Sequence, residues 1–381
     1  MSRLGTETAF EVLARARALE AEGRSIVFLG IGEPDFDTPP HIVAGAKEAL
    51  DEGFTHYTPA PGLSDVRSTI ASHMGERLGY PIPESRVVVT PGAKPVIFFT
   101  ILGVCEEGDE VVYPDPGFPI YESMIRFSGA TPVPMRLREE LGFNPDPDDL
   151  AGLFTPRTRL VILNSPNNPC GSVVPDETLE RIARLASASD AFVLSDEIYK
   201  DFHFEGAHTS ITRFPGMPER TVVLDGLSKS YAMTGWRVGY GVFPEVLVEP
   251  VVRLVTNSVS CTAAFSQRAT VTALMGSQEP VREMVAEFRA RRDLLLTGLN
   301  ALPGISCQPP RGAFYAFPNI KGTGLTSEEF ESRVLSEAGV SLLAGTSFGN
   351  EGQGYARISF ANSRENLAEA LRRLADFLAK L

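Results

Sequence analysis

The chain has 381 residues, of which 43% are hydrophobic and 22% are charged, so it is long enough to bury a large core and to form more than one domain. Its formal net charge of −13 would repel a phosphate backbone, which disfavours nucleic acid as a partner. The four cysteines lie far apart without a C-x-x-C pair, a pattern typical of reduced thiols in a cytoplasmic protein rather than of a structural metal site.

Residues 1–24 are rich in Ala, Glu and Arg at helical spacing. This stretch lacks the uninterrupted apolar core of a secretion signal, and no later apolar run is long enough to span a bilayer. The sequence therefore predicts an N-terminal helix, and it predicts neither secretion nor a membrane segment.

Between residues 84 and 242 the chain repeats a short β-branched run, a loop rich in Gly, Pro, Asn or Ser, and a helical stretch. This order predicts an α/β fold with a mainly parallel sheet whose strands are buried on both faces. The predicted strands are residues 86–90, 110–113, 158–163, 191–195, 221–224 and 237–242. Because ligands bind outside the carboxyl ends of such strands, we expect the functional site in the loops that follow them.

After residue 280 the pattern changes to a charged amphipathic helix through residues 289–299. Short strands near residues 312–317 and 355–360 and a closing helix through residues 365–381 are expected to follow. We therefore predict three parts: an N-terminal helix and bridge at 1–39, a large domain at 40–280, and a smaller α+β domain at 281–381, against which the N-terminal helix packs.

The most informative segment is residues 226–240, Gly-Leu-Ser-Lys-Ser-Tyr-Ala-Met-Thr-Gly-Trp-Arg-Val-Gly-Tyr. In it, Lys229 follows a predicted strand at a Gly/Ser loop, and Arg237 precedes the next strand. A lone lysine on a loop is usually exposed. If Lys229 is buried, its pKa falls below the ordinary value near ~10.4, and its amine can then form an imine at neutral pH.

This segment resembles the lysine motif of the class I/II pyridoxal-phosphate (PLP) aminotransferases, the fold type I enzymes related to aspartate aminotransferase. Further motifs match in the family's order: residues 32–39, Tyr57 with Gly62, and residues 90–94, 167–171, 195–199 and 356–360. The resemblance extends from residue 30 to residue 360. It implies a large domain with a mainly parallel, seven-stranded sheet, a smaller α+β domain, bound PLP and a homodimer.

The resemblance also implies roles for the residues that would hold PLP. Lys229 is expected to carry it as a Schiff base, Asp196 to keep its pyridine nitrogen protonated, and Tyr199 and Asn168 to hydrogen-bond its phenolic oxygen. The phosphate ligands are expected to be the backbone of Gly92, Ala93 and Lys94, the hydroxyl of Ser228 and the guanidinium of Arg237, with Tyr57 reaching the phosphate of the neighbouring subunit. Phe118 is expected to stack on the ring.

For the substrate, the resemblance implies that Arg357 binds the α-carboxylate, while Asn168 and the backbone of Gly32 complete that site. The sequence departs from many relatives at Gly226, where a serine often stands, so Ser228 or Ser230 is expected to supply the missing phosphate hydroxyl. Several of these residues also have a structural alternative: Asp196 as a helix cap, residues 167–169 as a simple turn, Phe118 in the core, Gly32 as an ordinary turn glycine, and the Lys94 side chain in solvent. The five histidines show no metal-binding spacing, so we predict no metal.

The implied function is a PLP-dependent aminotransferase that moves an amino group between an L-amino acid and a 2-oxo acid with ping-pong kinetics. A PLP-dependent lyase or synthase, acting by β- or γ-elimination or replacement, stays open as an alternative because it uses the same cofactor residues. A PLP-binding regulatory module is disfavoured, since only about 25 residues precede the motifs. Residues 257–264 lack the arginine that dicarboxylate-specific relatives often use, and this weakens an aspartate assignment without excluding it.

Overall fold

The structure, a computed structural model, describes residues 4–5 and 7–381, so residues 1–3 and 6 of the predicted N-terminal segment lie outside it. The helices are α1 Thr8–Ala21, α2 Pro40–Asp51, α3 Ser64–Leu78, α4 Lys94–Val104, α5 Ile120–Ser128, α6 Pro147–Leu150, α7 Asp176–Ala188, α8 Glu245–Ser258, α9 Ala264–Met275, α10 Glu279–Asn300, α11 Ser327–Arg333 and α12 Arg364–Leu378. The strands are β1 Val27–Phe28, β2 Val87–Thr90, β3 Glu110–Asp115, β4 Thr131–Arg138, β5 Asn144–Pro145, β6 Thr158–Asn164, β7 Phe192–Asp196, β8 Thr221–Gly226, β9 Gly239–Val242, β10 Tyr315–Ala316, β11 Val340–Ser341, β12 Leu343–Ala344 and β13 Ala356–Ser359.

One large sheet has the strand order β2-β9-β8-β7-β6-β3-β4-β5. The pairs β4–β3, β3–β6, β6–β7 and β7–β8 are parallel, whereas β9 is antiparallel to β2 and β8, and β5 is antiparallel to β4. Each of the six strands predicted for this sheet is present, with ends within two residues of the prediction. The mainly parallel α/β sheet is therefore confirmed, and the two-residue β5 adds an edge strand to the seven that the resemblance implies.

Strand β4 was not predicted, because Pro132 and Pro134 interrupt its β-branched pattern. Proline has no N–H to donate, so it fits where a strand has a partner on one side only. β4 pairs with β3 along residues 131–136, while β5 pairs only with Leu137 and Arg138. Both prolines thus lie at an open edge, where no ladder hydrogen bond is lost.

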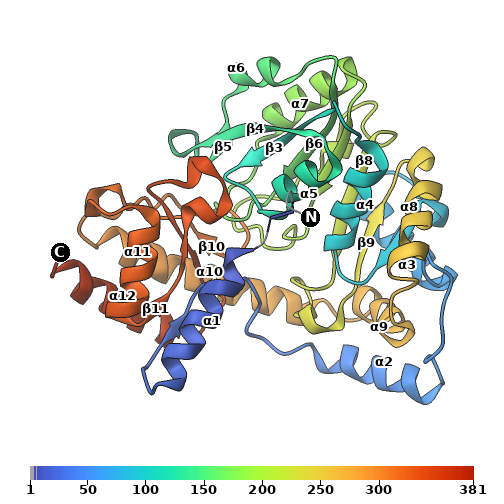
Figure 1. The fold of residues 1–381 in the computed structure, drawn as a ribbon. Coiled ribbons are helices and arrows are strands. Elements are labelled where there is room, and N and C mark those ends of the chain that lie inside the picture. Colours follow the sequence, from blue (N-terminus) through green and yellow to red (C-terminus); the bar gives the residue numbers. More distant parts are fainter. Residues whose placement is uncertain (1–3, 6) are drawn as a thin grey trace.

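Alternate strand residues point to opposite faces of the sheet and pack beneath different helices. Val88 belongs to the same apolar cluster as Val96 and Ile101 of α4, whereas Val87 and Val89 pack with α2, α3 and α9. Helices α4, α5 and α8 therefore cover one face, with α4 and α8 side by side (Figure 1). Helices α2, α3, α7 and α9 cover the other face.

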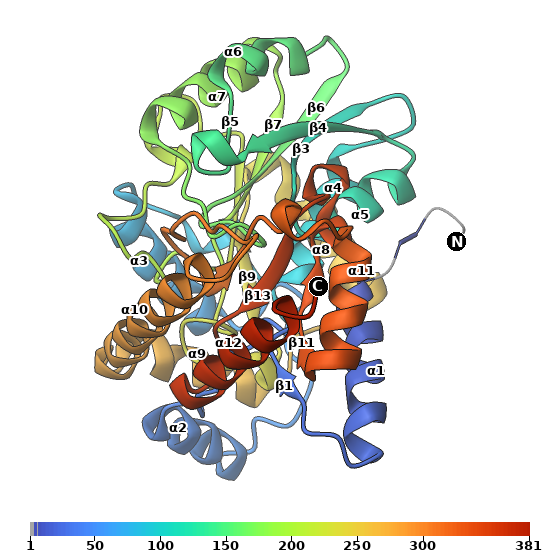
Figure 2. The same cartoon turned by 90° about the vertical axis from the view of Figure 1, so that its left-hand side faces the viewer.

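The C-terminal part contains the antiparallel sheet β10-β13-β12 and receives the N-terminal segment. β1 pairs in parallel with β11, and α1 lies beside α11 in both views (Figures 1 and 2). An ion pair of 3.3 Å joins Arg15 of α1 to Glu331 of α11. The boundary predicted at residue 280 falls in the first turn of α10, and the division into three parts stays a prediction. Within the described ranges, no helix combines the length and apolar character needed to cross a bilayer.

Phe288 of α10 brings together aromatic rings from segments far apart in the sequence. Its ring centroid lies 5.2 Å from that of Phe314 at an interplanar angle of 21°, 5.5 Å from that of Phe202 and 5.6 Å from that of Phe36. The side chain is fully buried. Because a well-packed ring makes many dispersion contacts, Phe288 should contribute strongly to the stability of the core between the large sheet and the C-terminal part.

We expect Phe288→Ala to lower the free energy of unfolding by about 3 to 5 kcal/mol, since it removes buried apolar area and leaves a cavity. Urea denaturation followed by tryptophan fluorescence would measure this loss. Val246→Ala, at a position 69% exposed, is the control and should change the free energy by no more than about 0.5 kcal/mol. Equal urea midpoints of unfolding for the two variants would contradict the role of Phe288 in stabilising the core.

Candidate active site

A cavity of about 370 Å³ opens at the carboxyl ends of the parallel strands, where the sequence places the site. It is lined by the predicted residues Gly32, Ala93, Lys94, Phe118, Asn168, Asp196, Tyr199, Ser228, Lys229, Arg237 and Arg357. Gly92 lies directly behind this lining, next to Arg237. Tyr57 is 90% exposed and does not line the cavity of its own chain. The fold thus gathers residues that are up to 325 positions apart in sequence, from Gly32 to Arg357.

Lys229 reaches the cavity from the turn that follows β8. Its Nζ donates a hydrogen bond to the carbonyl oxygen of Gly32, at 2.5 Å, and lies 5.9 Å from the ring centroid of Tyr199. Burial lowers the pKa of the Lys229 amine to about 8; Glu33 opposes this shift, and Arg357 and Arg237 add to it. The amine therefore loses its proton at a pH much closer to neutrality than an ordinary lysine does, which favours its action as a nucleophile or base.

Asp196 ends β7 and is 5% exposed. Its carboxylate accepts hydrogen bonds from the hydroxyl of Tyr121, at 2.6 Å, and from the backbone N–H of Ile198, at 3.2 Å. Burial raises the pKa of Asp196 to about 6, although both hydrogen bonds oppose the rise. Among the described residues, no lysine, arginine or histidine forms an ion pair with it. A buried carboxylate in this state would be stabilised by a bound cation.

Tyr121 and Tyr315 belong to the site, but sequence reasoning missed both. Tyr121 lies one helical turn after Phe118, and the two rings meet edge to face at 5.7 Å. Tyr315 shares a hydrogen bond with Tyr199, with 2.7 Å between the hydroxyl oxygens. Burial raises the pKa of Tyr199 well above its ordinary value. From sequence alone, an aromatic residue in a regular element is interpreted as part of the hydrophobic core. Only the contacts of these two hydroxyls with Asp196 and Tyr199 show that Tyr121 and Tyr315 belong to the site.

Arg357 extends from β13 into the cavity and is 4% exposed. Its Nη1 donates to the side-chain oxygen of Asn168 at 2.9 Å, and its Nη2 donates to the carbonyl oxygen of Gly30. The guanidinium lies 4.5 Å from the ring centroid of Tyr315 and 4.6 Å from that of Phe348. Its Nε is buried without a hydrogen-bond partner among the described residues. Arg357 is therefore a buried cation that no carboxylate of the described chain neutralises.

Backbone donors and a guanidinium meet where β2 leads into α4. Ala93 is the N-cap and Lys94 the first residue of this eleven-residue helix, and N–H groups at a helix N-terminus favour a nearby anion. Gly92 adopts φ = +86°, and a Cβ there would lie 2.1 Å from Nη2 of Arg237. The glycine is therefore required for close approach of the arginine to the helix N-terminus. The side chain of Lys94 does not lie free in solvent, because it forms an ion pair with Glu7.

The two serines expected to supply a hydroxyl point in different directions. Ser228 lines the cavity, whereas Ser230 is fully buried and donates to Asp201 on the far side of the turn. A Cβ at Gly226 would lie 3.1 Å from Cα of Gly239, so the close pairing of β8 and β9 leaves little room for a larger residue there. Ser228 is thus the serine that can reach a ligand.

We expect the amine of Lys229 in the protein without added ligand to react with a small acylating reagent at a rate that rises with pH through about 8. The sign follows from burial, which favours the neutral amine and so lowers the pKa. In urea-unfolded protein, the rise should move to the ordinary lysine value near ~10.4. Mass spectrometry of the peptide containing Lys229 measures both curves. Coincident curves would show that the amine is not buried.

The chain is similar to known proteins along most of its length. The family described as "Aminotransferase class I and II" matches residues 24–374. An aspartate aminotransferase of Pyrococcus horikoshii is 40% identical, over 96% of this chain and 92% of the relative, and an aromatic-amino-acid aminotransferase of Thermococcus litoralis is 41% identical, over 93% and 92%. The solved structure of an aspartate aminotransferase from Thermus thermophilus with maleate superposes with a TM-score of 0.94, at 37% identity and 99% coverage of both chains. This chain therefore belongs to the class I and II aminotransferase family and is an enzyme of the transaminase class.

Proposed function

We propose that this aminotransferase uses PLP, attached covalently through Lys229, to move an amino group between an L-amino acid and a 2-oxo acid with ping-pong kinetics. The observation that carries the proposal is that one cavity holds both Lys229, an amine with a lowered pKa, and Asp196, a buried carboxylate that pairs with no cation of residues 4–5 and 7–381. Similarity to named aminotransferases favours transamination over the lyase alternative. Perturbed groups of opposite type in one cavity are typical of an active site.

The residues present fit PLP in three respects. Asp196 has no positive partner among the residues that the structure describes, and a protonated ring nitrogen would supply one. Arg237, beside the N-terminus of α4 and behind Gly92, fits a phosphate dianion, with Ser228 adding a hydroxyl donor. Phe118 lines the same cavity and offers an aromatic face for a planar ring. When bound, PLP would supply an aldehyde that holds the amino group and a ring that accepts the electrons released at Cα.

The chain's own residues would bind the substrate and move the proton. Arg357 would bind the α-carboxylate, which replaces the weaker carbonyl acceptor at Gly30 and engages the free Nε. Asn168, already bonded to Arg357, and the backbone of Gly32 would border the same subsite. The Nζ of Lys229, once released, would accept the proton from the substrate Cα and return it on the other side of the transferred nitrogen. Tyr199 would donate its hydroxyl hydrogen to the cofactor's phenolic oxygen.

We further propose a homodimer in the cytoplasm. Tyr57 lies on the loop between α2 and α3 and exposes 90% of its surface. An aromatic side chain this exposed supports a role outside its own chain, and a twofold dimer would let it reach the neighbouring phosphate site. All four cysteines are free, which supports a reducing compartment.

The half-reaction tests the proposed function. One amino acid, added to cofactor-loaded protein without a 2-oxo acid, should change the visible absorbance once and release one 2-oxo acid per site without free ammonia. Continuous release of ammonia would instead identify a lyase.

Lys229→Ala should hold no cofactor after borohydride treatment and denaturation, because it lacks the amine that forms the covalent bond. Lys47→Ala, at an exposed position, should retain the cofactor. Fixation on another lysine would contradict the assignment of Lys229.

Arg357→Lys should lower kcat/KM by a factor equivalent to about 2 to 4 kcal/mol, since lysine keeps the charge but loses the planar, two-point contact. The loss should be similar for three amino acids with different side chains, because all share the α-carboxylate. Arg253→Lys, whose side chain is 72% exposed on α8, is the matched control. A changed ranking of the three substrates would identify Arg357 as a side-chain specificity residue instead.

A further inference from the structure

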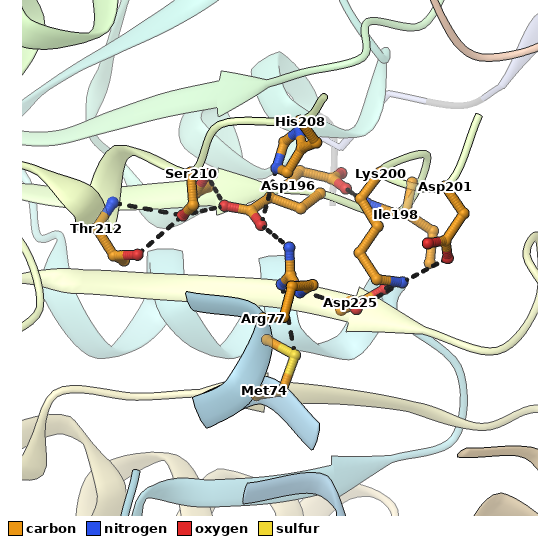
Figure 3. Close-up of polar contacts among 12 residues, drawn as sticks. Met74, Arg77, Asp196, Ile198, Lys200, Asp201, His208, Ser210, Thr212 and Asp225 are labelled. Carbon is orange, nitrogen blue, oxygen red and sulfur yellow. Dashed lines mark hydrogen bonds and ion pairs between the residues drawn. The ribbon is translucent and has the colours of Figure 1, made fainter. Parts of the chain in front are cut away.

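Five charged residues joined by ion pairs form a buried charge cluster, made up of Arg77, Glu197, Lys200, Asp201 and Asp225. Figure 3 labels all of them except Glu197, which directly follows Asp196 in the chain. Nη1 of Arg77 lies 2.6 Å from Glu197, and Nζ of Lys200 lies 2.9 Å from Asp201 and 3.0 Å from Asp225. Glu197, Lys200 and Asp225 are each less than 7% exposed, whereas the side chains of Arg77 and Asp201 are 19% and 36% exposed. Taking such charges out of water is costly, and the proposed chemistry uses none of them.

Residues of the buried charge cluster directly follow the proposed catalytic residues in the chain. Glu197 follows Asp196, and Lys200 follows Tyr199. In the same way, Ser230, whose hydroxyl donates to Asp201, follows Lys229. In each pair the first residue lines the cavity and the second points away from it.

Asp201 connects the two catalytic segments. Its Oδ2 accepts hydrogen bonds from the Ser230 hydroxyl and from the Lys200 ammonium. Burial opposes charge on Asp201, but Lys200 and Ser230 outweigh it and lower the pKa to about 2. Burial likewise opposes charge on Lys200, yet Asp201 and Asp225 raise its pKa. Both groups are therefore ionised, and charged hydrogen bonds are short and strongly directional.

We propose that Asp201 is a positioning residue, which fixes the turn bearing Lys229 against the segment bearing Asp196 and Tyr199 by binding Ser230 and Lys200 together. This inference rests on the proposed role of Lys229 as the cofactor-binding amine. Asp201 touches no substrate and acts through Ser230. Without these hydrogen bonds to Asp201, the turn at residues 227–230 can shift, and the amine of Lys229 then leaves its buried position.

A change in the titration of Lys229 could come from a changed charge nearby or from movement of the turn, and the Ser230→Ala variant separates the two. The charges that act most strongly on Lys229 are Glu33, Arg357, Arg237 and Lys94, and none of them belongs to the buried charge cluster. On its far side, the cluster faces the side chains of His73, His208, Tyr231 and Tyr240. Ser230→Ala changes no charge at all. A change in the titration of Lys229 in this variant therefore reports movement of the turn.

The test compares Ser230→Ala with Ser210→Ala. Ser210 is also buried and also donates to a buried carboxylate, that of Glu197 at 2.6 Å, but it does not touch Asp201. In protein without cofactor, Ser230→Ala should move the titration of Lys229 upward from about 8, whereas Ser210→Ala should leave it in place. In loaded enzyme, Ser230→Ala should lower kcat about tenfold with a smaller change in KM, within the loss that a small misplacement causes.

Asp201→Asn completes a double-mutant cycle. If Asp201 acts through Ser230, the double variant should lower kcat no more than the stronger single variant. If Ser230→Ala fails to fold, Ser230→Cys, which is similar in size and a weaker donor, replaces it. Ser230 and Ser210 variants that lose equal stability, with the Lys229 titration and kcat unchanged, would overturn the proposal. Failure of the proposed function is distinguishable, because it appears in the unsubstituted protein as absence of the half-reaction.

Discussion

The burial of one amine, that of Lys229, is the constraint on which the site depends. A lysine in water carries its proton at neutral pH and is a poor nucleophile. The fold lowers the pKa of the amine by enclosing it and by placing Arg357 and Arg237 nearby, with Glu33 as the main opposing charge. The same cations can bind anions, so the groups that prepare the lysine are also those that fit a phosphate and a carboxylate.

The parallel sheet explains how these groups meet. β6, β7 and β8 are neighbours and all end at the same edge, so Asn168, Asp196 and Lys229, which follow or end these strands, converge without long connections. At the end of β7 and in the turns beyond β7 and β8, Asp196, Tyr199 and Lys229 line the cavity. The residues that directly follow them, Glu197, Lys200 and Ser230, belong to the buried charge cluster or bind to it. A single backbone path therefore serves both chemistry and support.

The sequence predicts those parts of the fold and site that depend on local pattern. Short β-branched runs predict six strands of the large sheet, and the sequence places Asp196 at the end of a strand and Lys229 in the turn after the next one, as in the structure. Strand β4 was missed because its prolines are acceptable only at a sheet edge, which is a property of tertiary structure. Tyr121 and Tyr315 were missed for a similar reason. A tyrosine of the site differs from a tyrosine of the hydrophobic core only in the hydrogen-bond partner of its hydroxyl, which the sequence does not reveal.

Ser230 shows most clearly what sequence alone cannot decide. It neighbours Lys229, so proximity in sequence made it a candidate for the phosphate, yet its side chain points the other way, to Asp201. Stability does not account for this arrangement, because buried ion pairs are often no more stabilising than apolar residues of the same volume. Apolar contacts, however, tolerate sliding, whereas a charged hydrogen bond fixes both direction and distance. A site that must hold an amine, a carboxylate and a phenol at fixed distances from one another requires such directional hydrogen bonds. The buried charge cluster provides them through Asp201, on the side of the turn that faces away from the cavity.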